Sequence, residues 1–220
     1  MKLCVVNEGK VQKDFKLPEC DVALFGFGSL GEVDYQEEIA GKSFKLEEAA
    51  RLSKNADCAL FCGCVTIVKT HARKSVCVCE RGKLAGITDS LFVMDNENFK
   101  SGAGVGVYSA CGYKVGLCVE NDLLFPEVIK TLSLCGCNLV VAVLSELKNA
   151  MPPLLIRAYA YLYGVPVLMC AGKTAYFADT AGVIATSKQD ICLFETDIKN
   201  DYHVVSTRVR GKTCCENSDF

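Results

Sequence analysis

The chain has 220 residues and a formal net charge of −2, and half of its residues are hydrophobic while 23% are charged. This length suits one domain with a large core, and the balance excludes a disordered chain. The near-neutral charge argues against nucleic acid or an anionic membrane as the main partner. The one local basic cluster, at 71–74, is interpreted as a solvated turn between strands.

Apolar runs bounded by turn residues predict strands and helices in a mixed order. The predicted strands are 2–7, 21–27, 57–67, 74–79, 103–109, 113–119, 138–144, 165–171, 174–179 and 191–197, and the predicted helices are 44–55, 126–135 and 151–163. Hairpin turns are predicted at 80–83, 110–113 and 179–182. Hairpins mixed with helical crossovers favour an α/β layered sandwich over a doubly wound sheet. We expect a single domain at 1–205 and a flexible tail at 206–220.

Fifteen cysteines lie mostly inside apolar runs. No Cys-x-x-Cys pair occurs, and each of the Cys-x-Cys pairs at 62/64, 77/79 and 135/137 puts two thiols on one face if its segment is a strand. A zinc site built from such pairs is the less favoured alternative to cysteine as a small buried hydrophobe in a reducing compartment. We expect reduced thiols, no metal and no cofactor.

A cytoplasmic location is the expectation from the hydropathy of the chain. No apolar run reaches the roughly 18 residues that a membrane helix needs. The apolar start at 1–7 is too short for a signal peptide. The two histidines, His71 and His203, stand near no nucleophile motif and are interpreted as surface residues.

The most informative segment is Val115-Gly-Leu-Cys-Val-Glu-Asn-Asp-Leu-Leu-Phe-Pro-Glu127. It predicts a strand that bends sharply into a helix, a place where a side chain stands beside backbone N–H groups. The segment resembles the nucleophile signature of the carbon–nitrogen hydrolase (nitrilase) superfamily, apolar-Gly-x-x-Ile-Cys-x-Asp-x-x-Phe-Pro-Glu. Five positions match at the same spacing: Gly116, Asp122, Phe125, Pro126 and Glu127.

The resemblance continues in order along roughly residues 1–200. Upstream, 21–27 is similar to the strand that carries the family's glutamate, and 82–90 is similar to its Gly-x-x-x-Gly-x-Tyr-x-Lys stretch. Downstream, 138–141, Arg157-Ala-x-Ala160 and 179–183 resemble the next strand, the Arg/Ala-rich helix and the Asp-x-x-Gly hairpin. The first helix of the family is missing between the first two strands. The resemblance implies a four-layer α-β-β-α sandwich.

By implication, the family's chemistry uses a cysteine thiolate as nucleophile, a glutamate as general base and a lysine ammonium at the developing oxyanion. In this sequence the nucleophile position holds Glu120, the lysine position holds Ser90 and the glutamate position holds Phe27. A lost base costs about 10²–10⁴-fold in rate, and a lost oxyanion donor about 10²–10³-fold. These three substitutions favour a protein without the family's thiol chemistry.

An alternative nucleophile and a second glutamate position of the family are weighed beside that interpretation. Cys118 shares the strand parity of Glu120 and is an alternative nucleophile if the register shifts, although the spacing of Gly116 and Phe125 favours position 120. Asp95 or Glu97 would match the family's second glutamate, against the simpler interpretation of exposed acids in a polar loop.

A competing motif, Gly26-Phe-Gly-Ser-Leu-Gly31, follows an apolar strand as a dinucleotide fingerprint would. Glu32 and Asp34 would face a pyrophosphate, and no second strand ending in an acid follows at the expected interval. We interpret the glycines as a flexible loop and keep a dinucleotide-binding protein as an alternative.

The sequence therefore favours a nitrilase-like pseudoenzyme that acts as a binding or structural protein. The alternative is an active carbon–nitrogen hydrolase that uses Glu120, Asp122 or Cys118 on a small amide. The candidate binding residues are Asp122, Phe125 and Glu127. The resemblance implies a homodimer, and a small-molecule ligand is possible; we expect no nucleic-acid or membrane partner.

Overall fold

The computed structural model describes residues 1–12, 14–94 and 97–198. The predicted tail at 206–220, together with His203 and Asp95, lies outside the described residues. None of the described helices has the length and hydrophobicity of a membrane span.

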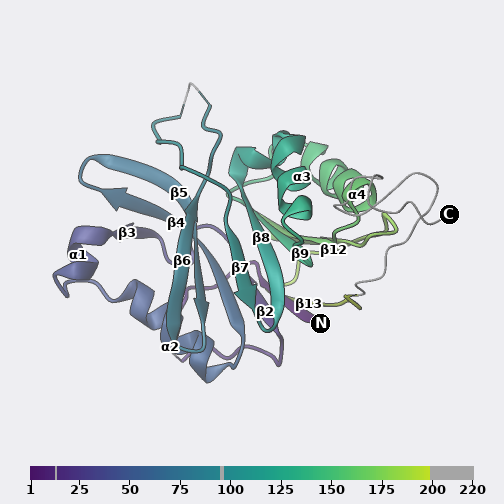
Figure 1. The fold of residues 1–220 in the computed structure, drawn as a ribbon. Helices are drawn as coiled ribbons and strands as arrows, with labels where there is room; N and C mark the ends of the chain where they lie inside the picture. Colours follow the sequence, from purple (N-terminus) through teal and green to yellow (C-terminus); the bar gives the residue numbers. More distant parts are fainter. Residues whose placement is uncertain (13, 95–96, 199–220) are drawn as a thin grey trace.

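Two mixed β-sheets form the centre of the fold (Figure 1). The first sheet has the order β13 (Ile191–Glu195), β1 (Lys2–Val6), β2 (Val22–Phe25), β4 (Ala59–Val68), β5 (His71–Glu80) and β6 (Lys83–Asp89), and β3 (Glu32–Asp34) also pairs with β4. The second has the order β12 (Ile184–Ser187), β11 (Thr174–Ala178), β10 (Val167–Ala171), β9 (Leu139–Leu144), β8 (Tyr113–Val119) and β7 (Val107–Ala110). In each sheet the middle strands run parallel, and most outer strands are added as antiparallel hairpins. The exception is β13, which comes from the other end of the described chain and pairs antiparallel with β1.

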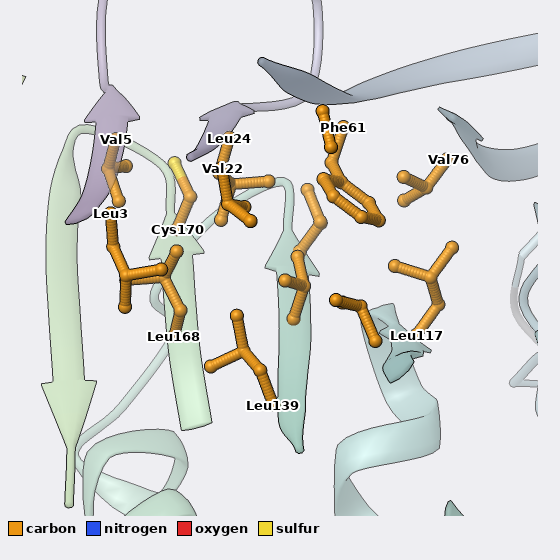
Figure 2. Close-up of a cluster of buried hydrophobic side chains, with 14 of the residues drawn as sticks. Leu3, Val5, Val22, Leu24, Phe61, Val76, Leu117, Leu139, Leu168 and Cys170 are labelled. Atoms are coloured by element: carbon orange, nitrogen blue, oxygen red, sulfur yellow. The ribbon is translucent and has the colours of Figure 1, made fainter. Parts of the chain in front are cut away.

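The two sheets face each other across a layer of hydrophobic side chains (Figure 2). Leu3, Leu24 and Phe61 come from the first sheet, and Leu117 and Leu139 come from the second; all are at most 1% exposed. Alternation along each strand sends these residues inward and their neighbours outward. Because both faces of the sheets are covered, the strands read as nearly continuous apolar runs in the sequence.

Helices cover the outer faces of both sheets. Helix α2 (Lys45–Asn55) places Ala49 and Leu52 against the outer side of the first sheet. Helices α3 (Pro126–Leu134) and α4 (Met151–Tyr163) lie on the second sheet, where Ile129 and Ile156 are fully buried. The order of layers is helix, sheet, sheet, helix, which confirms the predicted α/β sandwich.

Several elements differ from the sequence prediction. The short β3, β12, helix α1 (Tyr35–Ile39) and the 3-10 helix η1 (Glu120–Leu124) were not predicted, and neither was β6, although the turn before it was. The segment predicted as a strand at 103–109 is extended only from Val107. The predicted solvated turn at 71–74 is wrong, because these residues are the first four of β5 and pair with β4.

Candidate functional site

The bend after β8 is built on a close contact between a strand and a helix. A Cβ added at Gly116 would lie 2.9 Å from Leu132 Cδ2 and 3.0 Å from Cys137 Sγ, so only glycine lets α3 pack this near. The chain then leaves β8 at Val119, turns through η1 and enters α3 with Pro126 in its first turn.

Glu120 stands at the bend itself, in a backbone conformation that few residues adopt. Its φ is +54°, in the left-handed region that costs a non-glycine residue about 1–2 kcal/mol. Its side chain is buried, and Oε1 accepts a hydrogen bond of 2.8 Å from the N–H of Ser145, the residue that follows β9. Strained residues of this kind persist only where the surroundings fix them.

The cation nearest to Glu120 is Lys74, from β5. Its Nζ lies 3.7 Å from Glu120 Oε1 and 3.0 Å from Glu97 Oε1, and it sits 5.1 Å from the centre of the Phe99 ring. The Lys74 side chain is 15% exposed, so these charges interact with little screening by water. The bend therefore contains an ammonium between two carboxylates.

Glu97 connects this charge group to the loop after β6. One of its oxygens binds Lys74, and the other accepts a 3.2 Å hydrogen bond from Asn121 Nδ2. Burial by itself raises the pKa of Glu97, but the hydrogen bond and charge of Lys74 outweigh it and hold the pKa below its ordinary value. Glu97 also lines an open pocket of about 370 Å³ formed by Leu91, Phe92, Val93, Met94, Phe99, Lys100 and Ser101.

Lys74 is the hydrogen-bonded neighbour of Ser90, the residue at the position where the resemblance puts the family's lysine. The N–H of Ser90 donates to the carbonyl of Lys74 at 2.8 Å, next to the β5–β6 pair Ser75–Asp89. On β5, Lys74 has the parity of Val76 and Val78, which face the layer between the sheets. The ammonium thus comes from the neighbouring strand.

Ser90 and Asp122 belong to a buried hydrogen-bond network instead of carrying free polar groups. Asp122 Oδ1 accepts from the N–H groups of Leu91 and Phe92, at 2.8 and 2.9 Å, and from Ser90 Oγ at 3.2 Å. Asp122 Oδ2 accepts from the N–H of Val119. Burial raises the pKa of Asp122 although these donors oppose it.

The two other matched residues lie at the start of α3. The Phe125 ring stacks on Phe92, with centroids 3.6 Å apart and planes at 14°. Glu127 is exposed in the first turn of α3, where a carboxylate interacts favourably with the helix dipole. Phe125 therefore fixes the loop above the bend, while Glu127 faces solvent.

Phe27 and Cys118 lie in apolar surroundings. Phe27 is half-buried against the layer between the sheets, and its backbone passes so near β4 that a Cβ at Gly63 would lie 2.9 Å from it. The Cys118 thiol is fully buried among side chains of α3 and α4, and burial raises its pKa well above the ordinary value. Glu120 leaves the strand at positive φ, so the two residues do not share a surface.

The glycine loop at 26–31 has a different geometry from a dinucleotide fingerprint. Its last residue, Gly31, has φ +66° and is followed by strand β3, which pairs with β4. A fingerprint requires the glycines to open a helix whose N-terminus faces the pyrophosphate. Within the described ranges, no three His, Cys, Asp or Glu side chains converge as a metal ion would require.

Three contributors to the site were missed from the sequence: Lys74, Asn121 and Ser145. The two-residue period of β5 contained the signal for Lys74, because Val76 and Val78 set its inward parity. Ser145 acts through its backbone N–H, which no side-chain pattern reveals.

Comparisons with known proteins show which structures share this fold. No family model and no curated protein matches the sequence. An amidase of the nitrilase superfamily from Nesterenkonia sp. AN1 has a similar structure, with a TM-score of 0.70 and 14% identity over 90% of this chain and 93% of that chain. A carbon–nitrogen hydrolase from Helicobacter pylori G27 is equally similar, with a TM-score of 0.70 and 14% identity over 90% and 89% of the two chains. One mutant of the Nesterenkonia amidase carries acrylamide added to an active-site cysteine.

The likeness covers about nine-tenths of each chain. At 14% identity, the likeness shows the fold and does not determine the activity. The chain has the α/β fold of the nitrilase superfamily's amidases and carbon–nitrogen hydrolases.

Proposed function

We propose that this protein lacks the thiol-dependent amidase and nitrilase activity associated with its fold and acts as a binding or structural pseudoenzyme. The observation that carries the proposal is the carboxylate at the bend after β8. Glu120 is held there by Ser145 and Lys74. A carboxylate is a much weaker nucleophile toward an amide than a thiolate, and it puts negative charge beside a developing oxyanion.

The other two positions support the same conclusion. Phe27 can neither accept nor donate a proton, and a missing base costs about 10²–10⁴-fold. Ser90 already donates its hydroxyl to Asp122. Lys74 supplies a cation near the bend, but its ammonium is committed to two carboxylates.

The alternative function is carbon–nitrogen hydrolysis with relocated residues. One observation favours it: Lys74 and Glu97 place an ammonium and a carboxylate next to the bend, the pair that a relocated mechanism would need. Against it, Cys118 lies among helix side chains and its thiol pKa is raised, so it is a poor nucleophile. The pseudoenzyme remains the favoured proposal.

An ammonia-release assay with glutamine, carbamoyl compounds and simple nitriles tests the proposal. We expect no release above that of a Glu120→Ala preparation purified in parallel, which controls for contaminating hydrolases. Release by the wild-type protein that Glu120→Ala abolishes would contradict the pseudoenzyme proposal and support the alternative.

We also propose that the protein is a cytoplasmic homodimer. If its role is binding, we propose a small molecule as the ligand. The exposed apolar side chains of α4 support the dimer. None of the thirteen described cysteines is in a disulfide, which suits a reducing compartment. Alkylation of the native protein followed by mass spectrometry should find reduced thiols; several native disulfides would argue against this location.

A further inference from the structure

Two donor groups lie beside one oxygen of Glu120, one in a hydrogen bond and one in an ion pair. The Ser145 N–H lies 2.8 Å from Oε1, and the Lys74 ammonium lies 3.7 Å from the same atom. A backbone N–H and a partly buried cation that face one point form an anion-binding arrangement. In this protein the anion is supplied by the chain itself.

Both donors are fixed by contacts that do not involve Glu120. Lys74 is held by Glu97 and by the Phe99 ring, and Glu97 is held in turn by Asn121. Ser145 follows β9, whose last residue Leu144 is paired with β10. Removing the Glu120 side chain therefore leaves the two donors in place.

We expect the bend to keep its conformation without that side chain. Asp122 ties Val119 and the 91–92 loop together through its carboxylate, so the turn does not depend on Glu120. At φ +54° a glycine has no steric penalty, so Glu120→Gly relieves strain while it empties the site.

We propose that Lys74 Nζ and the Ser145 N–H form a site for a small carboxylate, which the Glu120 side chain occupies and closes in the native protein. A tethered carboxylate has a high effective concentration, so free monocarboxylates do not displace it at millimolar levels. This inference rests on the proposed role of the bend as a binding or structural site. It favours a structural role for the bend itself.

The test is thermal unfolding of the full chain in sodium acetate, with sodium chloride at equal ionic strength as reference. For Glu120→Gly we expect acetate to raise Tm saturably above chloride, by about 3 °C at ten times its Kd. Wild type should show no acetate-specific shift. Glu120→Gln should show none either, because its amide oxygen still accepts from Ser145. The double variant Glu120→Gly, Lys74→Met should lose the shift.

Three results would overturn the inference: no acetate-specific shift for Glu120→Gly, an equal shift for wild type, or a shift that persists after Lys74→Met. Glu120→Ala is the second variant should the glycine variant fail to fold, and the same outcomes apply to it. Because the readout is ligand-linked stability and not ammonia release, failure here is distinct from failure of the pseudoenzyme proposal.

Discussion

At the residue scale, the carboxylate of Glu120 at the sharp bend after β8 forms an ion pair with Lys74, which comes from β5 in the facing sheet. Glu120, Lys74 and Glu97 form a group with one excess negative charge, and the group is largely shielded from solvent. Each carboxylate has another donor, Ser145 for Glu120 and Asn121 for Glu97. The arrangement satisfies its polar groups internally, as buried charges require.

Lys74→Met should destabilise the protein in a pH-dependent way. The lowered pKa of Glu97 means that the Lys74–Glu97 interaction stabilises the folded state above the ordinary glutamate pKa of about 4.3 and is lost as pH falls through the folded-state value. The difference in free energy of unfolding between wild type and variant, from urea titrations, should therefore shrink from pH 7 toward pH 3. Lys2→Met, in the exposed Lys2–Glu19 pair, is the matched control and should change little. A difference in free energy of unfolding between wild type and Lys74→Met that does not change with pH would contradict the Lys74–Glu97 interaction.

Glu120→Cys should create a reactive thiol but no hydrolase. The Lys74 ammonium stabilises a thiolate at the bend, so the thiol pKa should fall below the ordinary value of about 8.5, and Lys74→Met should raise it again. The pH profile of iodoacetamide labelling, followed by mass spectrometry of the peptide that contains residue 120, measures this. Without a base at Phe27, ammonia release should stay absent. An unshifted thiol would show that Lys74 does not act at the bend.

The sequence predicted the carboxylate at the bend but not its partners. Spacing of Gly116 and Phe125 identified position 120 directly. The basic cluster at 71–74 predicts a solvated turn, because a run of basic residues at a strand start resembles a surface loop. Lys74 begins the predicted strand 74–79, so its inward parity follows from Val76 and Val78, but its contacts with Glu97 and Glu120 join segments far apart in the sequence and were not predictable.

At the element scale, the Asp122 carboxylate fastens η1 to the loop after β6. Three backbone N–H groups and one hydroxyl share its two oxygens. The Phe125–Phe92 stack joins the same two segments. Both oxygens of Asp122, which matches the family's motif, are therefore occupied by donors of the chain itself.

Asp122→Ala should cost about 2–4 kcal/mol in free energy of unfolding, because it leaves buried N–H groups of 91, 92 and 119 without an acceptor. Urea titration at pH 7 checks this, with Asp14→Ala at an exposed site as the control. A loss below about 0.5 kcal/mol, the range of ordinary surface substitutions, would show that the network is unimportant for stability.

Long apolar strands and the three main helices were predictable, and short or polar elements were not. β3 has three residues and β12 has four, too few for a periodic signal. β6 contains Gly86, where an added Cβ would lie 2.8 Å from Tyr108, and its first three residues are exposed. Such a strand owes its structure to tertiary packing, which overrides local propensity.

At the scale of the whole molecule, the ordered series of weak matches predicted the four-layer sandwich although no single motif did. The described chain keeps both sheets and the two helices on the second sheet, but no helix lies between β1 and β2. The first sheet is accordingly covered mainly by α2. The architecture was thus predictable from the order of the motifs. The site was not, because Lys74 and Ser145 lie outside these motifs.

The outer face of α4 supports the proposed dimer. Met151, Leu154, Tyr161 and Leu162 lie along one side of this helix and are 42–56% exposed. Leu154→Glu should convert a dimer into a monomer at micromolar concentration, as measured by light scattering during size-exclusion chromatography. Leu84→Glu, at an exposed leucine on β6, is the control and should leave the mass unchanged. A Leu154→Glu protein that elutes with the mass of wild type would exclude this face.

The most direct test of the account is a crystal structure of the wild-type protein at neutral pH. The account predicts the Glu120 carboxylate at the bend, within hydrogen-bond distance of the Ser145 N–H and beside Lys74. A structure in which Glu120 points to solvent, while the Cys118 sulfur projects from the bend between a cation and an acid, would contradict it.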